Sequence, residues 1–118
     1  MRFGVFYELQ MPKPWDAGSE QRIVHEALGQ VALADRLGFD HAWCVEHHFL
    51  EEYSHCSAPE VFLAAAAART KTIRLGHGIR QVIPNYNHPA RTAAAARKTS
   101  GAEQCEYSSR KWCSTHQA

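Results

Sequence analysis

Three strand patterns recur along the chain at intervals that fit strand-helix-strand units. They begin near Arg2, Asp40 and Thr72, so successive starts lie 38 and 32 residues apart. A strand, its crossover helix and the next parallel strand together take about 30 or more residues. The spacing therefore predicts a parallel sheet built by two crossovers, which places the chain in the α/β class.

A helical pattern follows the first strand. From Ile23 to Leu37 apolar residues recur at steps of three and four, which predicts one helix of about five turns with a buried stripe. Ser19 has the side chain of a good N-cap, and Gly38 suits the left-handed residue that ends a helix. We therefore expect the helix to run between these two residues.

Two more helices are expected further along. Ser57 and Glu60 have the spacing of a capping box and predict a second helix over 60–69, and a third should start near Pro89. The five alanines at 64–68 carry no long side chain, so another helix or the sheet could approach closely there. Simple helix propensity explains the same run equally well.

Composition narrows the class of protein. A chain of 118 residues with 45% hydrophobic content is long enough for one small domain with its own core. Its 13 basic and 12 acidic residues leave a formal charge of +1, which argues against nucleic acid or an anionic membrane as partner. The N-terminal apolar run is too short for a signal peptide, and no stretch could span a bilayer, so we expect a cytoplasmic protein. The four cysteines form no CxxC pair, which favours reduced thiols.

Titratable side chains gather where the second strand, 40–45, is expected to end. Glu46, His47 and His48 follow it directly. In parallel α/β folds, ligands bind at the carboxyl edge of the sheet, because side chains can converge there without disrupting the core. This segment is therefore the first candidate for an active site.

A metal site is the rival interpretation of the same region. Five residues could supply ligands: Cys44, His47, His48, His55 and Cys56. They lack the paired spacings of structural zinc sites, and adjacent histidines rarely bind one ion. We therefore expect no metal.

Five motifs, in order and spacing, resemble the N-terminal part of bacterial luciferase-like flavin-dependent monooxygenases over residues 1–92. They are Phe3-Gly4-Val5-Phe6, Leu37-Gly38-Phe39-Asp40, Glu46-His47-His48-Phe49, Leu75-Gly76-His77-Gly78 and Asn87-His88-Pro89-Ala90-Arg91. The resemblance implies a (β/α)₈ TIM barrel, a fold that takes about 250 residues. This chain would supply about three βα units at residues 1–96, which cannot close a barrel. Residues 97–118 match neither period and are expected to form an irregular polar tail, as in a truncated chain.

The resemblance also implies roles for individual residues. His47 corresponds to the family's catalytic histidine beside the flavin ring, where an imidazole can move a proton near neutral pH. Glu46 is the second candidate catalytic residue, as the group that orients the local hydrogen bonds; a solvated loop carboxylate is the alternative. His48 is expected to support His47 and to contact the flavin. Gly76, His77 and Gly78 are expected to contact the flavin through small side chains and backbone. Arg80 and Gln81 depart from the family's pattern, because apolar residues are commoner there.

The implied activity is a flavin-dependent oxygenation of a small organic substrate. Reduced FMN would come from a separate flavin reductase, and dioxygen would be the co-substrate. The resemblance further implies a dimer through the alanine-rich helices 60–69 and 93–96. Two alternatives stand beside this interpretation: a non-catalytic, truncated remnant that self-associates, and a deazaflavin-dependent reductase of the same superfamily. The sequence leaves open the substrate and whether this chain is an enzyme by itself.

Overall fold

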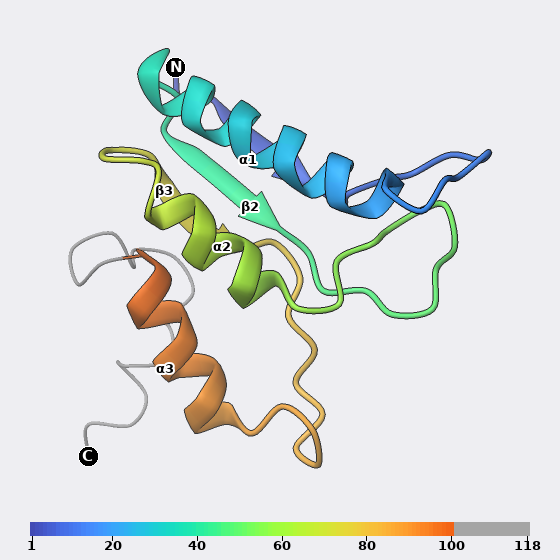
Figure 1. The fold of residues 1–118 in the computed structure, drawn as a ribbon. Coiled ribbons are helices and arrows are strands. Elements are labelled where there is room, and N and C mark those ends of the chain that lie inside the picture. Colours follow the sequence, from blue (N-terminus) through green and yellow to red (C-terminus); the bar gives the residue numbers. More distant parts are fainter. Residues whose placement is uncertain (101–118) are drawn as a thin grey trace.

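The computed structural model describes residues 1–100, and side chains as far as residue 95 (Figure 1). Strands and helices alternate in the order β1 (Gly4–Tyr7), α1 (Ser19–Arg36), β2 (His41–Cys44), α2 (Pro59–Ala67), β3 (Arg74–His77) and α3 (Pro89–Ser100). The three strands form one parallel sheet in the order β1-β2-β3. The predicted pair of parallel crossovers is therefore confirmed.

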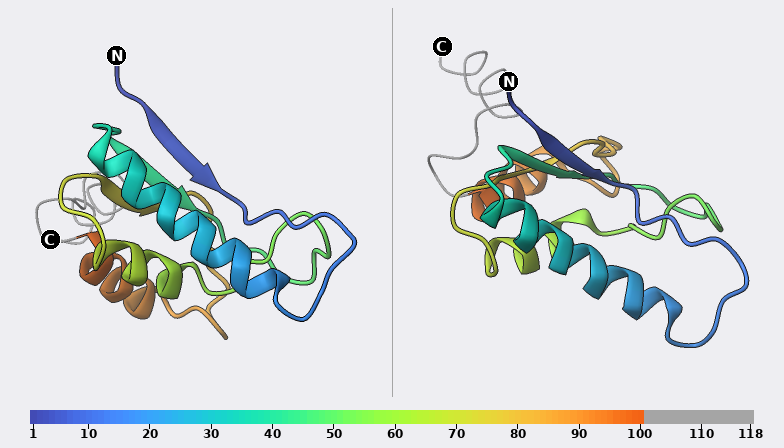
Figure 2. Two further views of the ribbon diagram at one scale, coloured as in Figure 1. Left: turned by 45° about the horizontal axis from the view of Figure 1, so that its top comes forward. Right: turned by 90° about the horizontal axis from the view of Figure 1, so that it is seen from above.

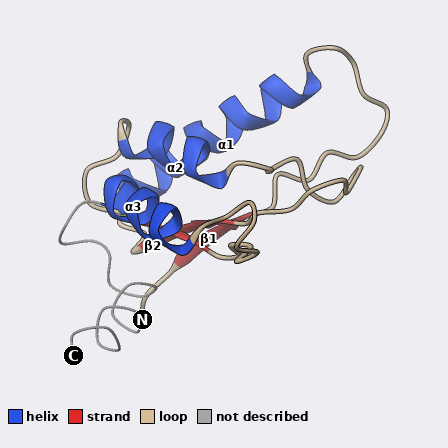
Figure 3. Cartoon of the chain, turned by 90° about the horizontal axis from the view of Figure 1, so that it is seen from below, coloured by secondary structure: helices blue, strands red, loops and turns tan. Residues whose placement is uncertain are grey.

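The helices lie on one face of the sheet, as two further views show (Figures 2 and 3). Between helices and sheet lies a single apolar core, whose most deeply buried members are Val31, Leu63, Ala66, Ile73 and Cys44. Alternate strand residues such as Val5, Ala42 and Leu75 face this core, because side chains of a strand point to opposite faces in turn. The strand residues between them therefore point to the opposite face of the sheet.

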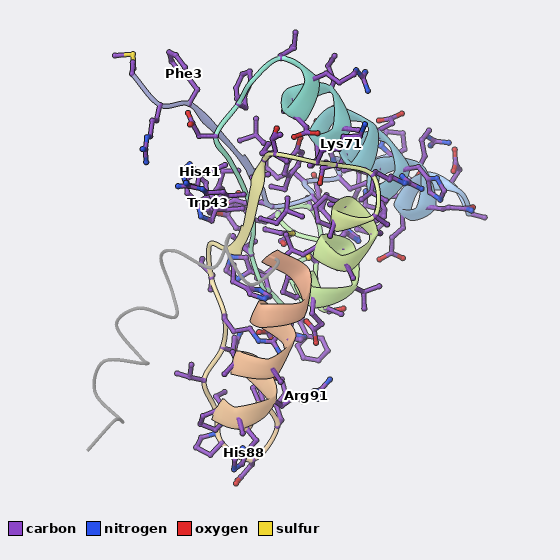
Figure 4. The ribbon with its side chains drawn as sticks, turned by 90° about the vertical axis from the view of Figure 1, so that its left-hand side faces the viewer. Phe3, His41, Trp43, Lys71, His88 and Arg91 are labelled. Atoms are coloured by element: carbon purple, nitrogen blue, oxygen red, sulfur yellow. The ribbon has the colours of Figure 1, made fainter. Side chains whose placement is uncertain are left out.

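The opposite face of the sheet carries aromatic side chains over small residues. The His41 ring stacks on the Trp43 indole with centroids 4.9 Å apart and planes only 1° apart (Figure 4). Phe6, which pairs in register with Trp43, is half-exposed on the same face. Among the described residues no helix covers this side of the sheet.

The ends of the helices show how tertiary contacts override local signals. Helix α1 ends as predicted, with Gly38 at φ +80°, the left-handed region that glycine adopts most readily. The prediction for Ser19 is wrong: Gly18 is the N-cap, and Ser19 Oγ instead accepts a 2.9 Å hydrogen bond from the Asp16 amide. The predicted capping box is also wrong, because Ala58 is the N-cap of α2 and the Glu60 carboxylate bonds to Arg80.

Asp35, near the end of α1, holds the segment that enters β3. Its Oδ1 accepts hydrogen bonds from the Thr72 amide, the Thr72 hydroxyl and the Ile73 amide, and its Oδ2 accepts one from the Lys71 amide, all within 2.9 Å. One carboxylate therefore satisfies four donors of a loop that precedes a strand. This contact fixes α1 against the start of β3.

Because the strands are parallel, the loops after them, 8–18, 45–58 and 78–88, share one edge of the sheet (Figure 1). Backbone hydrogen bonds join them: the Met11 amide donates to Glu52 O at 2.9 Å, and the Glu46 amide donates to Ile79 O at 2.9 Å. The three loops therefore form one connected layer at the carboxyl edge.

Residues 1–100 contain no helix that is both long and apolar enough to cross a membrane. Helix α3 begins at Pro89 as predicted and continues through 97–100, beyond the expected end of the domain at residue 96. The rest of the predicted tail, 101–118, lies outside the described residues, so the division at residue 96 stays a prediction.

Candidate active site

Glu46 lies in the protein interior directly after β2. The strand ends at Cys44, and the chain then turns beneath the loops, leaving Glu46 only 1% exposed. Of the two roles considered for this residue, a solvated loop carboxylate is therefore wrong. A buried carboxylate needs partners for its charge, since an unpaired one costs several kcal/mol, about as much as a small domain can spare.

Four groups supply those partners by hydrogen bonds. The Asn87 side-chain amide donates to both carboxylate oxygens at 3.0 and 3.1 Å, and the Gln81 backbone amide donates to Oε2 at 3.0 Å. The Tyr86 hydroxyl donates to Oε1 at 3.1 Å, and His48 Nε2 lies 3.1 Å from the same oxygen. Because a carboxylate only accepts, the contact with His48 requires a proton on Nε2. The Nδ1 atom of a neutral His48 is then left as the basic nitrogen.

Arg80 supplies the positive charge. Its side chain is only 9% exposed and lies 3.3 Å from Glu46 Oε2 and 2.6 Å from Glu60 Oε2. The same guanidinium donates to Asn87 Oδ1 at 2.8 Å. The departure at Arg80 from the family's apolar pattern therefore does not spoil the packing, because the cation is paired by two carboxylates. We call Glu46, Glu60, Arg80, Tyr86 and Asn87 the carboxylate cluster.

The cluster sets the ionisation of Glu46. Burial by itself would raise the pKa of Glu46, but hydrogen bonds from His48, the Gln81 amide and Asn87, together with the charge of Arg80, hold it below its ordinary value. Glu46 is therefore a carboxylate at neutral pH, and it acts as a fixed acceptor rather than as an acid.

The side chains of His47 and His48 contact different neighbours. The His48 ring stays with Glu46 and also lies 3.0 Å from the Tyr86 hydroxyl. The His47 amide donates to Cys56 O at 2.9 Å, and its ring meets the edge of Tyr53 at a centroid distance of 5.7 Å. Both histidines nevertheless line one pocket of about 490 Å³. They can do so because the strand ends before them, which removes the alternation that would point them to opposite faces.

The wall of this pocket contains a strained aromatic residue. Phe49 has φ +60° and its side chain is fully exposed. A non-glycine residue in the left-handed region costs about 1 to 3 kcal/mol, and such residues cluster at functional sites. Trp15 and His55 contribute to the same pocket from the far ends of their loops. The pocket therefore combines imidazoles with apolar aromatic surface.

The glycines expected to contact a flavin lie under aromatic side chains of this chain. A Cβ on Gly78 would fall 2.4 Å from Phe6 Cε2, and a Cβ on Gly76 would fall 3.1 Å from Trp43 Cδ1. Both glycines are therefore needed for close approach of a flat ring, and in this structure the rings are those of Phe6 and Trp43. The expectation of a direct flavin contact stays a prediction.

The structure separates His77 from these glycines. Cys44, its partner in register, belongs to the core, and the charges of Glu60 and Arg80 act on the His77 ring, so this side chain lies toward the helices. Both ring nitrogens are buried and have no hydrogen-bond partner among the described residues. Burial, and then the charge of Arg80, lowers the pKa of His77, which keeps the imidazole neutral.

The residues named for a metal site do not converge. In the part of the chain that the structure describes, no three His, Cys, Asp or Glu side chains lie close enough to hold an ion. Cys44 and Cys56 contact each other as free thiols, while His48 bonds to Glu46.

Sequence reasoning missed part of the carboxylate cluster. Asn87 stood out only as part of a family motif, and Tyr86 and Glu60 were given no role at the site. The sequence did contain a signal for Arg80. A single cation in a mostly apolar segment indicates that a carboxylate pairs with it in the interior, because charged side chains are rarely buried without a partner. Nothing in the sequence spacing, however, connects it with Glu46, 34 residues earlier.

Comparison with known proteins identifies the family. Residues 1–98 match the family of luciferase-like monooxygenases. The chain belongs to this family. Among similar curated proteins are limonene 1,2-monooxygenase of Rhodococcus erythropolis, 42% identical over 78 residues, and the oxygenase component of the flavin-dependent trigonelline monooxygenase of Acinetobacter baylyi, 30% identical over 99 residues. These alignments cover 64% and 84% of this chain but only 19% and 26% of the two relatives.

Solved structures of luciferase-like monooxygenases confirm the predicted fold, a portion of a TIM barrel with three βα units. The monooxygenase RslO1 from Streptomyces bottropensis superimposes with a TM-score of 0.64 at 36% identity, over 84% of this chain and 31% of RslO1. The oxygenating constituent of the Pseudomonas putida 3,6-diketocamphane monooxygenase, solved in complex with FMN, has a TM-score of 0.67 at 23% identity, over 84% and 28% of the two chains. The chain thus spans about a third or less of each of these proteins.

Proposed function

We propose that this chain forms the N-terminal part of an active site that oxygenates a small organic molecule with reduced FMN and dioxygen. The family supports this proposal, and so do two similar proteins whose names describe monooxygenases, one of them flavin-dependent. The observation that carries it is the buried carboxylate cluster at the carboxyl edge of the sheet. It fixes Glu46 and the His48 ring beside a pocket that His47 also lines.

Within this proposal the two histidines have different tasks. His47 lines the pocket without a side-chain hydrogen bond to the cluster, so its imidazole is available to accept or donate a proton there. His48 is held by Glu46 and Tyr86, which fixes its ring and its proton position. Glu46 is therefore a positioning residue that acts through His48, although the sequence had placed it among the catalytic groups.

The residues present fit a flavin ring. A pocket of about 490 Å³ is large enough for part of a cofactor, because ligand sites usually measure about 300 to 1,000 Å³. When bound, reduced FMN would supply the electrons that activate dioxygen. His48, on the wall of this pocket, would contact its ring. Gly76 and Gly78 lie outside the lining of the pocket and are covered by Trp43 and Phe6, so ring contact with these glycines would require the two aromatic side chains to move. The site for the rest of the cofactor is not specified by the described residues.

Several partners belong to the same proposal. One relative is named as an oxygenase component, which supports supply of reduced FMN by a separate flavin reductase. The dimer through α2 and α3 and the cytoplasmic location also remain proposals.

A chimera tests the proposed function. The 99 aligned residues of the oxygenase component of the Acinetobacter flavin-dependent trigonelline monooxygenase are replaced by those of this chain, and trigonelline oxygenation is measured with reduced flavin supplied by a flavin reductase. Activity within about tenfold of the parent would support the proposal. A folded chimera that binds FMN but does not oxygenate would contradict it.

The 118-residue chain alone should bind FMN weakly, because its pocket is open. We expect a dissociation constant of about 1 mM, which corresponds to a binding free energy of about 4 kcal/mol.

A second candidate function is a non-catalytic chain that self-associates. The observation in its favour is that, within residues 1–100, β1 and β3 each leave one edge unpaired, and unpaired strand edges promote association. Low-micromolar FMN binding by the chain alone would count against this candidate.

A further inference from the structure

The thiols of Cys44 and Cys56 contact each other in the apolar core, on either side in sequence of the candidate site. Cys44 Sγ lies 3.2 Å from Cys56 Sγ, and both cysteines are buried. Cys44 is the last residue of β2, and Cys56 lies three residues before α2. The sulfur atoms need to approach by only about 1 Å to reach the disulfide bond length of about 2.05 Å. We propose that Cys44 and Cys56 form an oxidation site, a dithiol that hydrogen peroxide converts into an intramolecular disulfide.

The environment distinguishes the two thiols. The contact with Cys56 and burial raise the pKa of Cys44, whose thiol also lies 3.9 Å from Val45 O. The pKa of Cys56 is lowered, chiefly by its hydrogen-bond contact with the Cys44 thiol, in which either sulfur can be the donor, and partly by a hydrogen bond from the Ala58 amide. Cys56 is therefore the better nucleophile, in agreement with its place just before a helix N-terminus.

The reaction balances with peroxide as the oxidant. The Cys56 thiolate attacks one oxygen of hydrogen peroxide, the O–O bond breaks, and the departing hydroxide takes up the thiol proton to form water. Cys44 then attacks the Cys56 sulfenic acid, the S–S bond forms, and a second water leaves. Two thiols are oxidised, one peroxide is reduced, and no other reactant is needed.

The position of the pair gives the oxidation a structural consequence. The eleven residues between the two cysteines include Glu46, His47 and His48. The His47 amide already donates to the carbonyl of Cys56. A disulfide would therefore close a short covalent ring around the segment that carries the candidate site. Amide hydrogen exchange within 45–55 should be slower in the oxidised chain.

The chain contains its own control pair. Cys105 and Cys113 lie 8 residues apart, closer in sequence than Cys44 and Cys56, which are 12 apart. An unfolded chain should therefore join the first pair at least as readily, since shorter loops close more easily. An excess of the Cys44–Cys56 disulfide in buffer that is lost in urea therefore depends on folding.

The experiment compares these two disulfides. The reduced 118-residue chain is treated with hydrogen peroxide in buffer and in urea. Remaining thiols are alkylated, and cross-linked peptides are quantified by mass spectrometry without reduction. We expect the ratio of the Cys44–Cys56 to the Cys105–Cys113 disulfide to be at least about tenfold higher in buffer than in urea. Equal ratios, or a Cys44 and Cys56 that stay reduced in buffer, would overturn the proposal. In Cys56→Ser, Cys44 should remain reduced; its unchanged oxidation would refute Cys56 as the attacking thiol.

Discussion

Asn87 and Glu46 are joined by two hydrogen bonds, from the Asn87 side-chain amide to each carboxylate oxygen, across 41 residues of sequence. The same amide donates to Gln81 O at 2.9 Å, and the Asn87 oxygen accepts from Arg80. One buried amide therefore connects the loop after β2 with the loop that leads into α3. This relationship gives the Asn87-His88-Pro89 motif a physical role that its sequence alone does not show.

Replacing this donor by an acceptor should damage the cluster. Asn87→Asp keeps the shape but puts a second carboxylate against Glu46, while Arg80 is already shared with Glu60. We expect the free energy of unfolding to fall by at least about 2 kcal/mol at pH 7, because a buried charged group loses its donor. The loss should shrink as the pH is lowered toward 5, since protonation of the introduced carboxylate restores a donor.

Urea unfolding of the variant at pH 7 and pH 5 measures this effect. Asn85→Asp is the matched control, because Asn85 lies in the same loop but is exposed. It should change the free energy of unfolding by less than about 0.5 kcal/mol. Equal losses in the two variants, or a loss that grows at pH 5, would show that Asn87 does not stabilise the Glu46 charge.

Asp35 should make the stability of the chain depend on acid pH. Burial alone would raise the pKa of Asp35, but hydrogen bonds from the Thr72 hydroxyl and from the amides of Lys71, Ile73 and Thr72 lower it to about 2. A depressed pKa in the folded state means that the contribution is fully present above the unfolded pKa of 3.8. It is lost as the pH falls from about 4 through about 2.

Comparison of the chain with Asp35→Asn tests this dependence. The variant should be less stable by about 1 to 3 kcal/mol at pH 7, because hydrogen bonds to a charged acceptor contribute about that much. The difference should shrink to a small remainder near pH 2, where Asp35 is almost fully protonated in the unfolded chain and about half protonated in the folded one. A difference in the free energy of unfolding that stays constant from pH 7 to pH 2 would contradict the role of the charge.

Periodicity predicted much of this fold, since three βα units follow from local patterns that core packing reinforces. The helix caps were harder to predict. Ser57 and Glu60 satisfy the local capping rule, yet Glu60 bonds to Arg80, because pairing a nearly buried guanidinium outweighs a local bond to a helix end. The position of Glu46 next to the site could be predicted, but its burial could not. That depends on Arg80, Tyr86 and Asn87, which only tertiary folding brings to it.

The alanines at 64–68 look alike in the sequence but differ in burial in the structure. Ala66 is fully buried in the core of this chain, whereas Ala64 is exposed on α2. Ala66→Leu should therefore lower the free energy of unfolding by about 1 to 3 kcal/mol through overpacking, rather than weaken a dimer as the sequence had suggested. Ala64→Leu tests the proposed dimer, because its side chain can touch a partner subunit.

Sedimentation velocity over a range of concentrations separates the two effects. Ala64→Leu should raise the dissociation constant of the dimer while leaving the unfolding midpoint in urea within error of the parent chain. The reverse pattern is expected for Ala66→Leu. A parent chain that sediments as a monomer at every concentration would remove the proposed dimer.

The final prediction separates His47 from His48. In the trigonelline monooxygenase chimera, His47→Ala should lower the rate of oxygenation by about 10² to 10⁴-fold, the usual contribution of acid-base catalysis, with little change in stability. His48→Ala removes a partner of buried Glu46, so it should cost about 1 kcal/mol of stability and reduce the rate much less. His48→Gln, which can still donate to Glu46, should recover most of that stability.

The two measurements are the oxygenation rate with saturating reduced FMN and the unfolding midpoint in urea. Equal rate losses in His47→Ala and His48→Ala would contradict the assignment, because the geometry gives only His47 a side chain that is unengaged by the carboxylate cluster.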